Sequence, residues 1–181
     1  MILAHLPAGY IITTRLLDRE RDINYRVQRR LLIWGMLCSV LPDFDMVYFY
    51  LIDNRQHLHH GYWTHLPVFW CCIAFLLYVY ARLRKNRVLR LFTVFGFLNI
   101  TGHLVLDTVT GKIRWFYPLS DMDVVFFHVP ARFDWWVWNF IFHWTFIFEA
   151  GLIGYAVYLF VNRSKVKQTA VNRLFSRTEL L

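Results

Sequence analysis

Histidines and aspartates gather in a few short stretches of an otherwise apolar chain. The stretch HHGYWTH supplies His60 and His65 around a glycine-containing turn. The stretch GHLVLD supplies His103 and Asp107 four positions apart, which places both on one face of a helix, about one turn from each other. Imidazole and carboxylate groups together are typical ligands of zinc, manganese or iron. For HHGYWTH the alternative is an incidental polar loop. For GHLVLD the alternative is a histidine that is bonded to a local carboxylate.

A third stretch, LPDFD, places Asp43 and Asp45 directly after Pro42. Proline cannot donate a backbone hydrogen bond and disfavours helical geometry at the preceding residue, so we expect a helix to break or restart here. Both carboxylates then lie in the first turn of a new half-helix, where the positive end of the helix dipole stabilises them. The alternative is a kinked helix capped by Asp43, which leaves Asp45 unexplained.

Long apolar segments must position these residues. The chain of 181 residues is 57% hydrophobic, 19% aromatic and 18% charged, which is typical of a membrane protein. A helix needs roughly 20 residues to cross the hydrocarbon core. The chain begins with a short apolar stretch. Four further apolar segments are a little shorter or longer than 20 residues: 31–52, 66–81, 88–108 and 135–161. We predict an all-α, polytopic transmembrane helical bundle with about four spans plus a short N-terminal helix.

The basic residues predict how this bundle is oriented. Sixteen of the 20 Lys and Arg residues lie in 15–30, in 82–90 and after 161. If successive segments cross the membrane, these three regions fall on one side, which the positive-inside rule makes cytoplasmic. The formal charge of +8 thus reflects membrane orientation, and we expect no nucleic-acid partner. We predict one membrane-embedded domain over 1–161 and a basic cytoplasmic tail over 162–181.

With this orientation, the histidines and aspartates lie at the outer ends of the apolar segments, opposite the basic regions. We therefore predict a multi-pass membrane protein, with its site toward the outer face and its C-terminus in the cytoplasm. Ionisable groups within spans are costly, at about 2.5 to 3.5 kcal/mol for Asp, so they normally face the bundle interior with a partner. A metal ion is the partner that offsets several of them together. The sequence carries no signal for an oligomeric state.

Taken together, AHLPAG, LPDFD, HGYWTH and GHLVLD, followed by YPLS, resemble the bacterial YdjM-like family of membrane-bound metal-dependent hydrolases, also described as LexA-regulated. The resemblance covers about residues 1–120 and implies that the membrane is the bacterial inner membrane, so that the outer face is the periplasmic one. Gly61 stands where the family has arginine, Leu66 replaces serine and Leu119 replaces phenylalanine, departures that bear on substrate handling more than on metal binding. The resemblance implies these metal-site residues: His5, Asp43, Asp45, His60, His65, His103 and Asp107.

The predicted cofactor is a divalent metal, zinc first and manganese or iron as alternatives. Seven candidate ligands exceed the three or four that one zinc ion takes, so one ion with a spare carboxylate and two bridged ions both stay open. Such a metal lowers the pKa of bound water toward about 7, and Asp43 or Asp107 takes or returns the proton. We predict hydrolysis of an ester or phosphoester in a membrane lipid or lipid-linked substrate.

Further polar residues lie outside these stretches. Glu149 lies midway through the last apolar segment and is a third catalytic candidate beside Asp43 and Asp107, with a helix-to-helix hydrogen bond as the equal alternative. The basic residues of the last outer connection, Lys112, Arg114 and Arg132, are suited to hold a phosphate or carboxylate and equally suited to anchor headgroups.

Two other classes of function compete with the hydrolase. A metal or proton transporter also uses broken helices with central carboxylates, but it predicts polar groups toward both membrane faces, and the inner halves of these segments are nearly bare. A non-catalytic membrane adaptor would use the basic loops and tolerate loss of the histidines.

Overall fold

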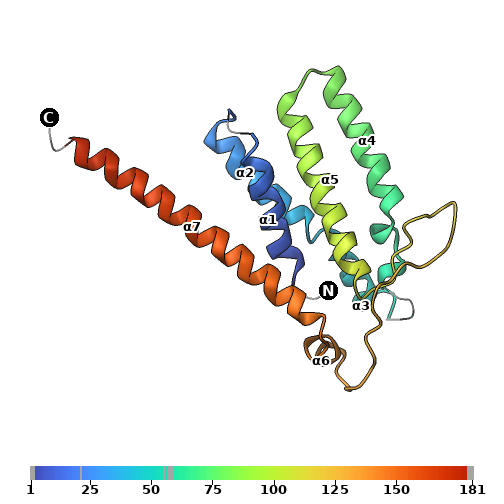
Figure 1. The fold of residues 1–181 in the computed structure, drawn as a ribbon. Coiled ribbons are helices and arrows are strands. Elements are labelled where there is room, and N and C mark those ends of the chain that lie inside the picture. The colour runs from blue at the N-terminus through green and yellow to red at the C-terminus, as the bar shows by residue number, and fades with distance from the viewer. Residues whose placement is uncertain (1–2, 21, 55, 57–58, 179–181) are drawn as a thin grey trace.

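The computed structural model describes residues 3–20, 22–54, 56 and 59–178, with the backbone alone for 59 and 165–178. Within this part of the chain every regular element is a helix, in agreement with the predicted all-α class (Figure 1). The elements in order are α1 His5–Leu17, α2 Tyr25–Cys38, η1 Pro42–Phe44, α3 Asp45–Leu51, η2 His59–Gly61, η3 Trp63–His65, α4 Pro67–Leu83, α5 Arg87–Thr108, α6 Trp136–Ile141 and α7 Phe146–Thr178, where η denotes a short 3-10 helix.

Helix α5 lies at the centre of the bundle and packs against α1, α2 and α4, while α7 packs against α1. Small and polar residues bring α1, α2 and α5 together, as is common where helices meet in membranes. A Cβ added at Gly35 would lie 2.9 Å from Asn99 Nδ2 and still closer to Thr13 Oγ1. Asn99 is fully buried, and its Nδ2 donates to Thr13 Oγ1 at 3.0 Å and to the Phe95 carbonyl at 2.8 Å.

The predicted break at LPDFD is confirmed. Helix α2 ends at Cys38, the 3-10 turn η1 begins at Pro42, and α3 begins at Asp45. The two halves are bent by 52°. After the break, Asp43 Oδ1 lies 3.5 Å from His103 Nε2 of α5, whereas Asp45 faces His65 of η3.

The predicted count of about four spans is not confirmed in the described residues. Helix α5 and the part of α7 from Phe146 to Ser164 are long and apolar enough to cross a membrane, and the bent pair α2–α3 raises the number to three. Helix α4 has 17 residues, because Pro67 starts it directly after η3. The segment expected over 135–161 is divided, since α6 ends at Ile141 and α7 begins only at Phe146.

The connections of the bundle fall into two groups at opposite ends of the molecule (Figure 1). The α1–α2 and α4–α5 connections share one end, where Arg87 pairs with Glu20 at 2.8 Å and with Asp22 at 2.6 Å. Helices α3 and α6 and the irregular connection 109–135 lie at the other end. The region predicted as a basic tail, 162–181, is helical as far as Thr178 and continues α7.

We predict that Gly35→Val destabilises the contact between α1, α2 and α5. The added atoms overpack a site bounded by Thr13 and Asn99, so the free energy of unfolding should fall by about 2 kcal/mol. Unfolding of the full chain in detergent, followed by circular dichroism, measures this. Gly151→Val is the matched control, because a Cβ at Gly151 meets nothing within 4 Å. An equal loss in both variants would contradict the packing described for Gly35.

Candidate metal centre

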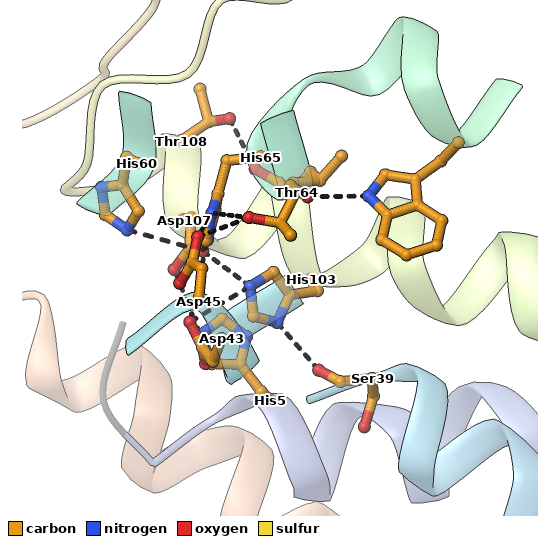
Figure 2. Close-up of polar contacts among 12 residues, drawn as sticks. His5, Ser39, Asp43, Asp45, His60, Thr64, His65, His103, Asp107 and Thr108 are labelled. Atoms are coloured by element: carbon orange, nitrogen blue, oxygen red, sulfur yellow. Dashed lines mark hydrogen bonds and ion pairs between the residues drawn. The ribbon is translucent and has the colours of Figure 1, made fainter. Parts of the chain in front are cut away.

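Four side chains converge at the end of α5, where η1 and η3 meet it (Figure 2). His103 Nε2 lies 2.9 Å from Asp107 Oδ2, and His65 Nε2 lies 3.6 Å from the same oxygen. Asp43 Oδ1 lies 3.5 Å from His103 Nε2 and 3.7 Å from His65 Nε2. One ligand atom from each residue lies within 4.8 Å of all the others. The set is termed the His/Asp centre here and consists of Asp43, His65, His103 and Asp107.

Local structure explains how each member reaches the His/Asp centre. Helix α5 presents His103 and Asp107 from consecutive turns of one face. The break after α2 presents Asp43, and the 3-10 turn η3 presents His65 just before Pro67 starts α4. The two histidine side chains are 0% exposed and that of Asp107 is 2% exposed, whereas that of Asp43 is 34% exposed. Asp43 is therefore the open side of the His/Asp centre.

Hydrogen bonds on the far side of each imidazole fix how the two rings point. His103 Nδ1 lies 2.8 Å from the Ser39 carbonyl oxygen, which only accepts, so Nδ1 carries the proton and Nε2 turns its lone pair toward the His/Asp centre when the ring is neutral. His65 Nδ1 lies 2.8 Å from Asp45 Oδ2. Partners of this kind hold metal-ligating histidines in the required tautomer.

The structure gives Asp45 a supporting position rather than the direct ligand position expected from the sequence. Its Oδ2 faces His65 Nδ1 and also accepts a hydrogen bond from Thr64 Oγ1. Trp70 Nε1 donates to the Thr64 carbonyl at 2.7 Å and fixes the turn η3, which contains Thr64 and His65. Asp45 is 7% exposed, so its charge is balanced within the protein rather than by solvent.

Two further predicted residues, His5 and His60, reach the His/Asp centre through Asp107. His5 Nε2 lies 3.1 Å from Asp107 Oδ1, and its ring stacks on His103 with centroids 3.9 Å apart. His60 Nε2 lies 3.7 Å from Asp107 Oδ2. A Cβ at Gly111 would lie 2.5 Å from His60 Nδ1, so the glycine leaves the room that this ring needs. Asp107 thus has four imidazoles around its carboxylate (Figure 2).

Glu149 contacts the chain next to His5. Its Oε2 accepts backbone hydrogen bonds from Leu3 at 2.6 Å and Ala4 at 3.2 Å, and the residue is 3% exposed. Because His5 is the first residue of α1, these bonds position its imidazole. Glu149 is not a member of the His/Asp centre, and its catalytic role stays a prediction.

The charge balance of the centre suits a cation. Burial by itself lowers the pKa of His65, but hydrogen bonding to Asp107, Asp43 and Asp45 outweighs burial and raises that pKa to about 11. The carboxylates therefore favour positive charge at this point. Two imidazoles and two carboxylates form a donor set that zinc, manganese or iron accepts, whereas calcium and magnesium prefer oxygen ligands alone. The residues present fit a divalent transition metal.

A cavity of about 710 Å³ adjoins the His/Asp centre, with His60 in its wall. Helices α3 and α6 and the connection 109–135 form the rest of the wall. The sequence indicated the basic residues Lys112 and Arg114 in this connection but not that they share a cavity with His60. It also gave no signal for the Ser39 carbonyl, because a backbone group that orients a histidine is set by tertiary contact alone.

We predict that His103→Ala and Asp107→Asn each remove most of the metal that copurifies with the full chain. Each change takes away a buried donor of the four-residue set, and losing a ligand weakens the binding of a divalent metal. Elemental analysis of protein purified in mild detergent measures the metal-to-protein ratio. His143→Ala is the control, because His143 lies outside both the His/Asp centre and the cavity wall. Unchanged metal in both centre variants would contradict the assignment.

We predict a graded effect for Asp45→Ala. Loss of the carboxylate behind His65 leaves the imidazole present but free to rotate, so metal affinity should fall about 10- to 100-fold without being abolished. Competition with a chromogenic chelator gives the affinity, and a circular dichroism spectrum checks that the helices remain. A loss as complete as that of His103→Ala would instead make Asp45 a direct ligand.

We compared the chain with known protein families, curated proteins and solved structures. A model of the family described as YdjM inner membrane protein matches residues 1–173, which includes every residue of the His/Asp centre. No curated protein and no solved structure matches the chain. The match confirms the resemblance seen in the motifs and extends it through most of α7. The chain therefore belongs to the YdjM inner membrane protein family.

Proposed function

We propose that this protein is a membrane-embedded metal-dependent hydrolase that cleaves an ester or phosphoester bond in a lipid or lipid-linked substrate at the outer face of the membrane. The observation that carries the proposal is a buried His/Asp centre next to a cavity of about 710 Å³, with His60 contacting Asp107 and also lining the cavity. Buried ionisable groups with specific charge partners beside a cavity are typical of catalytic sites.

We assign each side chain of the site a role according to its burial and its contacts. His65, His103 and Asp107 are buried and are the ligands that hold the metal, which when bound supplies the Lewis acidity that activates water. Asp43 is the most exposed carboxylate of the centre and is the residue that we propose accepts the proton of the attacking water. His5 and His60 contact Asp107 and keep its carboxylate oriented.

Two observations support a site at the outer face. The basic α1–α2 and α4–α5 connections lie at the end of the bundle opposite the His/Asp centre, and the positive-inside rule assigns such connections to the cytoplasm (Figure 1). At the site end, Trp135, Trp136 and Trp138 are 54%, 45% and 40% exposed. Amphipathic indole rings favour the headgroup level. Substrates with a scissile bond near the headgroup would then meet the His/Asp centre without leaving the membrane.

We predict that the zinc-loaded full chain in proteoliposomes hydrolyses a lipid of a bacterial inner-membrane extract and that Asp43→Asn lowers the rate at least about 100-fold. Asparagine keeps an oxygen at this position but cannot take the proton, and general-base catalysis contributes on that order. Mass spectrometry of the lipids measures turnover, and elemental analysis measures retained metal. Asp134→Asn is the control, because Asp134 is exposed and outside the centre.

The same vesicles separate hydrolase from transporter. Metal movement across the bilayer with every lipid intact would contradict the hydrolase and support transport. Turnover by Asp43→Asn at the wild-type rate, with metal retained, would contradict the role given to this carboxylate.

A further inference from the structure

The cavity beside the His/Asp centre has one polar side and one apolar side. Lys112 and Arg114 of the connection 109–135 lie in its wall near His60. Phe49 of α3 and Phe140 of α6 lie in its wall as well, together with the exposed ring of Trp136. Asp121 and Asp123 lie in the wall as well, and a cavity of this composition fits an amphiphile with a polar head and an apolar chain.

The two cationic side chains on the polar side differ in whether a carboxylate forms an ion pair with them. Lys112 Nζ lies 3.7 Å from Asp123 Oδ2, so a carboxylate already offsets its charge. Arg114 Nη2 donates to the Gly61 carbonyl at 2.8 Å, and its guanidinium lies over the ring of Tyr117. No carboxylate pairs with Arg114 among the residues that the structure describes. Arg114 is therefore a cation of the cavity wall that has no ion pair with any described residue, and Asp121 lines the same cavity.

The position of Arg114 relates this charge to the His/Asp centre. Its partner Gly61 directly follows His60, whose Nε2 lies 3.7 Å from Asp107 Oδ2. A guanidinium offers five donors in a planar fork, of which the contact with Gly61 uses one. The fork matches the oxygens of a phosphate, which it binds in bidentate fashion.

We propose that Arg114 binds the phosphate of the substrate, so that the substrate class is a phosphate-bearing lipid whose apolar chain lies against Phe49, Trp136 and Phe140. This inference rests on the proposed function and makes it more specific. It selects a lipid that bears a phosphate over an ester lipid that has none. Lys112, already paired with Asp123, lies in the same wall and adds no net charge of its own.

A substitution at Gly61 tests the positive charge of Arg114 separately from any structural role of that side chain. A Cβ added at Gly61 would lie 3.8 Å from Arg114 Nη2, which is ordinary van der Waals contact. An arginine at position 61 therefore enters the space that the guanidinium leaves when Arg114 is shortened. In the double variant Gly61→Arg/Arg114→Ala the charge returns from a different backbone position, which a merely structural role of Arg114 would not reproduce.

The experiment is photo-crosslinking of the full chain in detergent with a phosphatidic acid that carries a diazirine on one acyl chain. We expect crosslinks in 46–50 and 136–140, displaced by dioctanoyl phosphatidic acid at about tenfold lower concentration than by dioctanoyl glycerol. Arg114→Ala should lower crosslinking about tenfold, since one charge-assisted contact is worth on that order. Arg132→Ala, at an exposed arginine outside the cavity wall, should leave it unchanged, and the double variant should restore it.

Three results would overturn the inference: equal displacement by dioctanoyl glycerol, equal displacement by inorganic phosphate, or undiminished crosslinking of Arg114→Ala. Equal displacement by phosphate would mean recognition of the free anion rather than of a lipid. The readout is binding, so it stays separate from the proposed function. Specific binding without turnover contradicts the hydrolase alone, whereas turnover of a phosphate-free ester, with no preference for phosphatidic acid, contradicts this inference alone.

Discussion

The buried carboxylate of Asp107 is the constraint on which the rest of the site depends. A carboxylate that is 2% exposed at the end of an apolar helix is stable only when positive or proton-donating groups surround it. Imidazoles from four separate parts of the chain supply that surrounding: His5 from α1, His60 from η2, His65 from η3 and His103 from α5 itself. One charge thus brings the N-terminal helix and two short turns to the same end of α5.

The helix break at Pro42 connects this charge to the fold. In an uninterrupted helix the Ser39 carbonyl would accept from the amide four residues later, but Asp43 N donates to the Val40 carbonyl at 3.2 Å instead. The Ser39 carbonyl is thereby available to His103 Nδ1. The same break turns Asp43 toward the His/Asp centre and starts α3 with Asp45, which orients His65. The break at a single proline therefore places one carboxylate of the His/Asp centre and the oxygen atoms that contact Nδ1 of His65 and of His103.

The sequence predicted those features that depend on local spacing and failed where tertiary contact decides. The pair His103 and Asp107 followed from helical periodicity, and the break followed from Pro42. The family resemblance implied Asp45 as a metal-site residue, and only the fold shows that its Oδ2 faces His65 Nδ1 at 2.8 Å. The contact of Arg114 with Gly61 joins residues 53 positions apart, which no local pattern encodes. The count of about four spans is not confirmed, because α4 has only 17 residues and because α6 and α7 are separate helices, which hydropathy does not register.

Helix α7 holds α1 at both of its ends. Glu149 accepts the amides of Leu3 and Ala4 before the first turn, and Arg163 donates to the Thr14 carbonyl and to Asp18 after the last. Two attachments about 14 residues apart along α7 prevent α1 from sliding or rotating on it. The position at which His5 meets Asp107 therefore depends on how the last helix packs on the first, far along the chain from every residue of the His/Asp centre.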